Sequence, residues 1–192
     1  MRLILVRHGR PNEIDPATPG DPSLNEDGRR QARAVARLLA GEGITRIIAS
    51  PMRRALETAQ PLADGVGLGV DIVPGWAEAD RGAHRYRSTE TLRAEGGEAW
   101  ARFLADPIRY LGAEPEAFRA PLDATAAGED RTARVAVFTH GLPVNVVLAH
   151  ALGLDSVTTF LVGYGSVTRL RRRVEGWGVA SVNETAHHRS ET

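Results

Sequence analysis

Two short apolar runs, each followed one residue later by a His-Gly pair, constrain the fold of this chain more than any other feature. Leu3–Val6 precedes His8-Gly9, and Val135–Phe138 precedes His140-Gly141. Runs this short and apolar on both faces are typical of buried parallel strands. Ligands bind beyond the carboxyl ends of such strands in an open α/β sheet. If the two strands are neighbours, His8 and His140 share one crevice.

Strand-like and helix-like segments alternate along the chain, which favours an α/β fold. We expect a three-layer αβα sandwich around a mainly parallel sheet, with a small helical insertion over the active site. The pattern predicts strands over 3–6, 44–49, 70–73 and 135–139, a β-hairpin of 166–174 with 177–182, and helices over 26–40, 51–65 and 143–152. Asn25 is expected to cap the first of these helices, and Ser50 with Pro51 to start the second.

Residues 1–186 are predicted to form a single domain. Within it, residues 83–131 are expected to be the insertion, with helices over 90–105 and 115–126. Residues 187–192 are expected to be a disordered tail, because a polar chain end with few apolar groups has little to hold it in place.

Composition narrows the chemistry that is available. The 192 residues include 24 basic and 24 acidic side chains, no Cys and, by inspection, no Lys. A zero net charge argues against a general nucleic-acid or anionic-membrane surface. The lack of Cys excludes disulfides and thiolate chemistry, and the lack of Lys excludes Schiff-base chemistry and a P-loop lysine. An anion pocket must therefore use Arg, His or backbone N–H groups, and Arg suits phosphate because its planar fork donates two parallel hydrogen bonds.

The sequence contains no stretch long enough to span a bilayer and no signal-peptide pattern at Met1–His8. We therefore expect a cytoplasmic protein. The oligomeric state is left open, with a homodimer as one option.

The expected strand ends collect groups that suit phosphoryl transfer. An imidazole with a free ring nitrogen is a competent nucleophile, and we assign that role to His8. Arg7, Arg54 and His140 can hold the three equatorial oxygens of the phosphoryl group in flight. Arg and imidazolium also neutralise the charge that a metal handles elsewhere, so no metal and no cofactor are expected.

A carboxyl group is also needed, to protonate the departing alkoxide and then to take a proton from water. Glu78 follows the third expected strand and is the leading candidate. Asp80, Glu13 and Glu90 are alternatives that could reach the site. The segment 84–87 (His-Arg-Tyr-Arg) is interpreted either as a solvated loop or as a rim that contacts the organic part of the substrate.

In order along the chain, these motifs resemble the histidine phosphatase superfamily, which includes cofactor-dependent phosphoglycerate mutases. The resemblance runs from residue 3 to about residue 170 and uses the segments 7–9, 23–32, 50–59, 78–82 and 140–141. It implies that His8 is phosphorylated, that Arg7, Arg54 and His140 clamp the phosphate, and that Glu78 donates the proton.

The chain departs from the family pattern at several positions around the site. The family often has Asn six residues after the nucleophile, where this chain has Ile14. Either Asn12 substitutes for it, which is the prediction made here, or the contact is missing. Gly141 and Leu142 are expected to line the phosphate pocket, although the family commonly has Gly or Asn at the second of these positions. Asn145 stands where the family often has Arg.

The resemblance implies a metal-independent phosphomonoesterase. It would hydrolyse a small phosphorylated metabolite through a phosphohistidine intermediate and release inorganic phosphate. The alternatives are phosphoryl transfer of the phosphoglycerate mutase type and a non-catalytic phosphate-binding module on the same fold.

Overall fold

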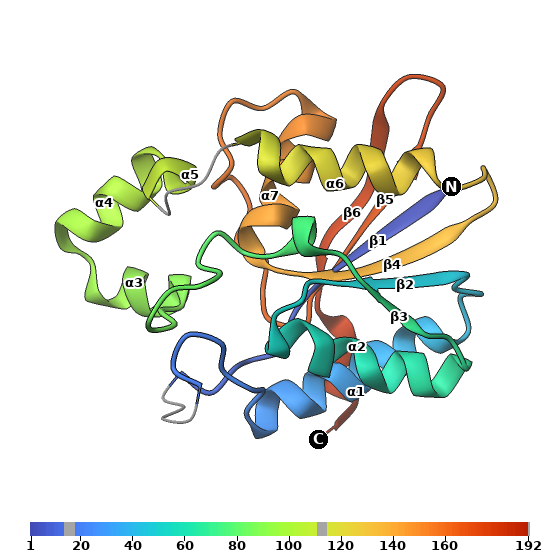
Figure 1. Cartoon of the computed structure of the whole chain (residues 1–192), viewed down its shortest axis with the longest axis horizontal. Helices are drawn as coiled ribbons and strands as arrows, with labels where there is room; N and C mark the ends of the chain where they lie inside the picture. The colour runs from blue at the N-terminus through green and yellow to red at the C-terminus, as the bar shows by residue number, and fades with distance from the viewer. Residues whose placement is uncertain (14–17, 111–114, 192) are drawn as a thin grey trace.

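The computed structural model describes residues 1–13, 18–110 and 115–191. Its centre is one sheet of strand order β3-β2-β4-β1-β5-β6 (Figure 1). The strands are β1 (Arg2–Arg7), β2 (Arg46–Ala49), β3 (Val70–Ile72), β4 (Arg134–Thr139), β5 (Val167–Arg172) and β6 (Trp177–Glu184). The first four are mutually parallel, and β5 and β6 are the antiparallel hairpin. The expected mainly parallel sheet is confirmed.

Alternation along the strands builds two cores, one on each face of the sheet. In β1, Leu3 and Leu5 point to one face, and Ile4 and Val6 to the other. Helices α6 (Pro115–Ala127) and α7 (Gly141–Leu152) cover the first face, and α1 (Glu26–Ala40) and α2 (Arg53–Val66) cover the second (Figure 1). The predicted three-layer sandwich is therefore correct, because strands buried on both faces need a helix layer on each side.

Local capping explains where one helix begins and corrects the start of another. Asn25 Oδ1 accepts the Gly28 N–H at 2.9 Å, and α1 spans the predicted residues. The prediction that Ser50 caps α2 is wrong, because α2 begins at Arg53 with Met52 at the N-cap position. The Ser50 hydroxyl instead accepts the Met52 N–H at 3.2 Å in a tight turn before the helix. Ser50 is thereby left at the strand end.

The segment between β3 and β4 divides into two parts. The first contains η1 (Pro74–Trp76), α3 (Thr89–Glu95), α4 (Gly97–Ala105) and α5 (Pro107–Tyr110). Helices α3–α5 lie at one end of the sheet, beyond the carboxyl ends of the parallel strands (Figure 1). The helix expected over 90–105 is broken at Gly96 and Gly97, which have φ of 63° and 67°. The second part, α6, belongs to the sandwich, because it buries Leu122 against the sheet.

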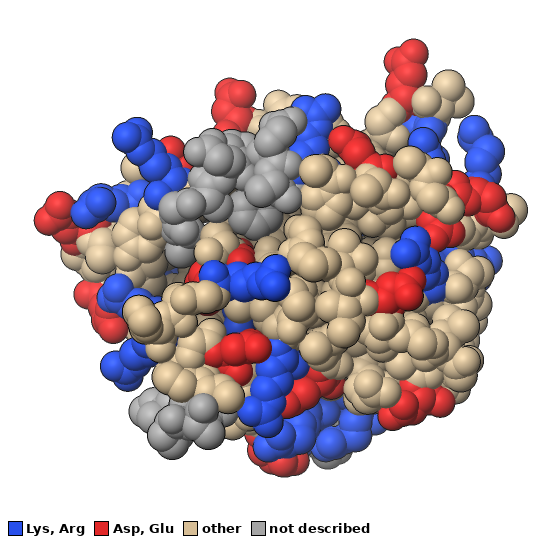
Figure 2. Space-filling view, in the orientation of Figure 1, with Lys and Arg blue, Asp and Glu red and all other residues tan. Residues whose placement is uncertain are grey.

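The end of the chain differs from the expected tail. Residues 186–191 form a short 3-10 helix, η2 (Ala186–Glu191), that packs against α1. Ile14 lies outside the described residues. In the described parts of the chain, no helix is both long and apolar enough to cross a membrane. Acidic and basic side chains are interspersed over the face seen in Figure 2.

Candidate active site

The two imidazoles leave neighbouring parallel strands at the same level of the sheet. β1 pairs with β4 in a register that places Arg7 beside Thr139. His8 and His140 are the residues that directly follow this last pair. The His8 N–H donates to the Thr139 carbonyl at 2.9 Å, which extends the pairing by one step. The ring centroids of His8 and His140 lie 5.1 Å apart. The structure therefore brings the two histidines together, as the strand pattern predicts.

One hydrogen bond sets the tautomer of His8. Its Nδ1 lies 2.8 Å from the carbonyl oxygen of Gly9. A carbonyl can only accept, so Nδ1 carries the proton and Nε2 keeps a free lone pair. Burial, and then the positive charges of Arg54 and Arg7, lower the pKa of His8 well below its ordinary value. The ring is therefore neutral at physiological pH, with Nε2 able to act as a nucleophile.

Two glycines let the loop after His8 lie directly on the first turn of α1. A Cβ on Gly9 would come within 2.5 Å of the Gly28 carbonyl oxygen, and a Cβ on Gly28 would come within 2.1 Å of the loop backbone. The Gly9 N–H donates to Thr58 Oγ1 at 2.9 Å, and that hydroxyl donates to the Arg54 carbonyl at 2.6 Å. The His8 loop is thus tied to the helix that carries Arg54.

Arg54 lies at the start of α2 and is fully buried. Its NH2 donates to Asp80 at 3.1 Å, and its NH1 lies 3.6 Å from a carboxylate oxygen of Asp21. The ring of Tyr86 lies 4.6 Å from the guanidinium carbon. These contacts hold the guanidinium in place beside the strand ends. The preceding residue, Arg53, instead pairs on the surface with Glu57 at 2.8 Å.

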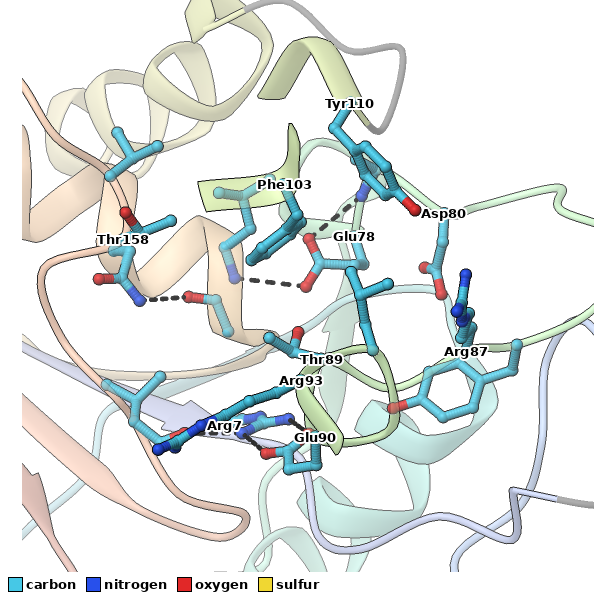
Figure 3. A pocket seen from close by; sticks show the side chains of 18 of the residues that line it. Arg7, Glu78, Asp80, Arg87, Thr89, Glu90, Arg93, Phe103, Tyr110 and Thr158 are labelled. Atoms are coloured by element: carbon cyan, nitrogen blue, oxygen red, sulfur yellow. Dashed lines mark hydrogen bonds and ion pairs between the residues drawn. The ribbon is translucent and has the colours of Figure 1, made fainter. Parts of the chain in front are cut away.

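Arg7 is held from three sides at the end of β1. Its NH1 and NH2 donate to the two carboxylate oxygens of Glu90 at 2.7 and 3.1 Å (Figure 3). Its NH1 also donates to the Val162 carbonyl at 2.6 Å. The guanidinium stacks 3.9 Å above the ring of Tyr164, whose hydroxyl donates to Glu90 at 2.9 Å. The Glu90 carboxylate is therefore engaged by Arg7 and Tyr164 in this structure.

Four buried nitrogen atoms around His8 have no hydrogen-bond partner among the described residues. They are Arg7 Nε, Arg54 Nε and NH1, and His140 Nδ1. A buried donor that lacks an acceptor costs about 1–3 kcal/mol, so such atoms mark a place where a ligand supplies acceptors. Three of the four belong to guanidinium cations, and the ligand they suit is an oxyanion.

The fourth nitrogen depends on the proton of His140. Its Nε2 lies 2.8 Å from Ser50 Oγ, so a Ser50 hydroxyl that donates there leaves the ring proton on Nδ1. Burial, followed by the charges of Arg54, His8 and Arg7, lowers the pKa of His140 well below its ordinary value. The neutral ring can then offer Nδ1–H to the same anion.

Glu78 follows η1 in a turn that is anchored by Trp76. The Trp76 side chain is fully buried, and the backbone carbonyl of Trp76 accepts a hydrogen bond from the Thr139 hydroxyl at 2.7 Å. The Glu78 carboxyl accepts only weak backbone N–H contacts, at 3.2 Å from Ala79 and 3.3 Å from Leu142. Burial, and then the negative charge of Asp80, raise the pKa of Glu78 to about 7. A carboxyl group of this kind can hold and release a proton near neutral pH.

These side chains open into a pocket of about 630 Å³. Of the predicted site residues, Arg7, His8, Arg54, Glu78, Gly141 and Leu142 line it. His140 is fully buried, with its ring beside that of His8. In the segment 84–87, the last three residues line the pocket, so this segment is part of its wall. In the described ranges, no group of three or more His, Asp or Glu side chains is arranged to hold a metal ion.

Two polar residues do not join the phosphate cradle. Asn12 bonds to Ser23 through its side-chain amide at 3.1 Å and does not line the pocket, contrary to the role predicted for it. Asn145 lines the pocket, but its side-chain amide is hydrogen-bonded to backbone groups. Its Nδ2 donates to the carbonyls of Gly141 and Phe160 at 3.0 Å, and its Oδ1 accepts the Phe160 N–H at 3.0 Å.

Two residues that contribute to the site are not predicted from the sequence. Tyr164 supports Arg7, and the only local signal for it is an aromatic residue between two glycines just before a strand. Ser50 was assigned to helix capping, whereas its hydroxyl faces His140.

A model of the histidine phosphatase superfamily (branch 1) matches residues 3–185. The chain belongs to this superfamily. A histidine phosphatase relative, the probable phosphoglycerate mutase GpmB of Erwinia tasmaniensis, is 26% identical, and the match covers 97% of this chain and 94% of that protein. The family carries both phosphatases and mutases among the named relatives, so this chain is an enzyme of the phosphatase or mutase type.

Solved structures of the superfamily have the same fold. The phosphoserine phosphatase of Entamoeba histolytica, solved with 3-phosphoglyceric acid, is 25% identical, with a TM-score of 0.77 over 97% of this chain and 98% of that one. A mycobacterial glucosyl-3-phosphoglycerate phosphatase, solved with VO3, is 23% identical, with a TM-score of 0.78 over 96% and 99% of the two chains. At this level of identity the second comparison shows the fold alone.

Proposed function

We propose that this histidine phosphatase hydrolyses phosphomonoesters without a metal, through a phosphohistidine formed on His8. The single observation that carries the proposal is the set of four buried nitrogens on Arg7, Arg54 and His140 that have no hydrogen-bond partner among the described residues and belong to side chains near the ring of His8, whose Nε2 is free. Such a set supplies the acceptor-seeking N–H groups that the oxygens of a phosphoryl group need, beside an atom that can attack phosphorus. The named phosphatases with this fold support the same reaction.

In the first step, His8 Nε2 attacks phosphorus, and the bond from phosphorus to the ester oxygen breaks. Arg7, Arg54 and His140 hold the three equatorial oxygens, where charge spreads in the transition state. Protonated Glu78 gives its proton to the departing alkoxide, which leaves as the alcohol.

In the second step, a water molecule attacks the phosphorus of phosphohistidine. Glu78, now a carboxylate, takes a proton from this water. The P–N bond breaks, its electron pair returns to Nε2, and inorganic phosphate leaves. Glu78 ends the cycle protonated again, and a pKa of about 7 suits both of its roles.

The test is turnover of p-nitrophenyl phosphate in the presence of EDTA. We expect activity that survives chelation and is lost in His8→Ala, with a stoichiometric phosphoenzyme trapped in the wild-type protein. Asn12→Ala is a suitable control, since its side-chain amide donates to Ser23 and Asn12 is not among the described residues that line the pocket. Activity that needs an added divalent metal, or that persists in His8→Ala, would overturn the proposal.

Phosphoryl transfer of the mutase type is the second candidate, because relatives named as probable phosphoglycerate mutases match the chain. A mutase returns the phosphoryl group from His8 to the substrate. Incubation with 3-phosphoglycerate, with and without 2,3-bisphosphoglycerate as a primer, separates the two. Release of inorganic phosphate supports the phosphatase, and primer-dependent formation of 2-phosphoglycerate supports the mutase. A non-catalytic module would bind phosphate and do neither.

A further inference from the structure

The pocket is far larger than the phosphate cradle at its floor. Its volume of about 630 Å³ lies within the usual range of about 300–1,000 Å³ for sites that enclose a whole organic ligand. Of its many lining residues, only Arg7, His8 and Arg54 carry the phosphate cradle assigned above. The rest of the pocket must therefore receive the alcohol part of the substrate.

One wall of that space is aromatic and comes from α4 and α5. The rings of Trp100 and Phe103 stack with centroids 5.5 Å apart at an interplanar angle of 16°. Tyr110 meets Phe103 edge-on at 5.8 Å and 89°. All three line the same pocket as Glu78, and Phe103, Tyr110 and Glu78 are labelled in Figure 3. The group leaving from phosphorus would meet this wall, because Glu78 is the residue that protonates it.

The other wall is apolar and comes mainly from the loop that follows α7. Val157, Phe160 and Leu161 line it, together with Leu142 at the start of the helix. The three backbone hydrogen bonds of Asn145, two of them to Phe160, hold this loop against α7. Leu161 is 67% exposed, and Leu104 on the aromatic side is 46% exposed. Apolar side chains left open to water around a pocket mark a surface that a ligand covers.

The charged residues at the pocket do not favour a small polar alcohol. Arg87 is paired with Glu95, Arg54 with Asp80, and Arg7 with Glu90. Arg81, Arg85 and Arg93 also line the pocket but are exposed, so their long side chains can keep their charge in water. The interior between the two walls is thus predominantly apolar.

We propose that the substrate of this site is a phosphomonoester whose alcohol carries an aromatic ring or a branched apolar group close to the phosphate. The inference rests on the proposed phosphatase function and names its substrate class. The ring would lie between Phe103 and Leu161, with the ester oxygen toward Glu78. Small hydroxylated or amino-acid alcohols would leave both walls exposed to water.

The experiment compares 2-phenylethyl phosphate with ethyl phosphate. Their leaving alcohols are of similar acidity, so the comparison reports contact with the ring and not the ease of P–O cleavage. Burying one phenyl ring predicts a kcat/KM ratio of about 10 to 100 in favour of the phenyl ester. Phosphoserine and 3-phosphoglycerate serve as polar esters in the same assay.

The variants test the wall directly. Leu104→Asn should reduce the ratio of phenyl to ethyl ester about three- to tenfold, because it places an amide against the ring. Leu152→Asn is the matched control, since Leu152 is also 46% exposed but lies at the end of α7 and does not line the pocket. It should leave the ratio unchanged. Phe103→Ala should have a larger effect, with its melting temperature measured to check that it folds.

The outcomes separate this inference from the proposed function. Hydrolysis that depends on His8 but proceeds equally with both esters, or prefers phosphoserine or 3-phosphoglycerate, would overturn the substrate class and leave the phosphatase intact. Equal loss in Leu104→Asn and Leu152→Asn would also overturn it. Absence of turnover with every ester would overturn both the substrate class and the proposed function.

Discussion

Glu90 forms a bidentate ion pair with Arg7, accepting hydrogen bonds at 2.7 and 3.1 Å, although the two residues belong to different parts of the fold. Arg7 ends the central strand β1, and Glu90 lies on α3 in the segment that rims the pocket. Tyr164 completes the contact, with its ring under the guanidinium and its hydroxyl on Glu90. The rim of the pocket is thereby connected to a side chain that we assign to the phosphate cradle.

We expect Glu90→Gln to slow phosphorylation of His8 about tenfold in single-turnover experiments. The amide retains the shape of the carboxylate but loses the charge-assisted pair, so Arg7 is less firmly oriented toward the phosphoryl oxygens. Glu98→Gln, an exposed substitution on the neighbouring helix α4, is the control and should change the rate less than twofold. Equal rates in the two variants would contradict a positioning role for Glu90.

Arg54→Ala should slow phosphoenzyme formation at least 100-fold, whereas Arg53→Ala should change it less than about twofold. Arg54 is buried, and its Nε and NH1 make no hydrogen bond among the described residues, so both can donate to the transition state. The adjacent Arg53 is exposed and paired with Glu57. Rapid-quench measurement of the phosphoenzyme compares them. Similar losses in both variants would mean that the cradle has been assigned to the wrong arginine.

Glu78→Gln should harm esters with poor leaving groups more than esters with good ones. A proton donor matters most when the departing alkoxide is strongly basic, and a nitrophenolate leaves without help. We expect a loss of about 100-fold or more in kcat with an alkyl phosphate and less than about tenfold with p-nitrophenyl phosphate. A uniform loss would indicate that another carboxyl group at the site, such as that of Asp80, is the acid.

The activity toward alkyl esters should fall as the pH rises through about 7. The pKa of Glu78 is raised to about 7, so the protonated acid is the main form below that pH and is lost above it. The pKa of His8 is lowered well below its ordinary value, so its nucleophilic form persists across this range. The pH profile of kcat/KM measures this directly. An alkaline limb that survives unchanged in Glu78→Gln would show that another group causes it.

Gly28→Ala should destabilise the protein by about 1–3 kcal/mol and reduce activity together with stability. The added Cβ would lie 2.1 Å from the backbone of the loop that follows His8, and the overpacking must displace either that loop or α1. Gly65→Ala is the matched control, because a Cβ there has open space inside α2 and should stabilise slightly. Thermal unfolding of both variants tests this. An unperturbed Gly28→Ala would mean that the close approach is dispensable.

Most of the fold could be predicted from local pattern. Strands apolar on both faces require helices on both sides, so the sandwich follows from Leu3–Val6 and Val135–Phe138 alone. The juxtaposition of His8 and His140 was predictable for the same reason, because parallel neighbours in register deliver their carboxyl ends to one place. Asn25 set the start of α1 through a hydrogen bond within its own turn.

The predictions that differ from the structure concern residues whose positions depend on contacts between distant segments. The sequence predicts Asn12 in the phosphate cradle because it lies close to the position where the family often has Asn. In the structure its side-chain amide donates to Ser23 instead. Ser is a residue type that favours N-cap positions, but the Ser50 hydroxyl faces His140, which lies 90 residues later in the sequence. The segment 115–127 reads as part of an insertion, yet α6 covers the sheet because Leu122 is buried there.

The sequence by itself determined the layers, the strand ends and the residue types available for an anion site, since periodicity, capping and the absence of Lys and Cys act locally or exclude chemistry outright. Only the tertiary structure decided which groups share that site and in what state. The tautomer of His8, the raised pKa of Glu78 and the grip of Glu90 on Arg7 come from burial and from partners distant in the chain. No local pattern carries that information, because desolvation and long-range pairing exist only once the layers have packed.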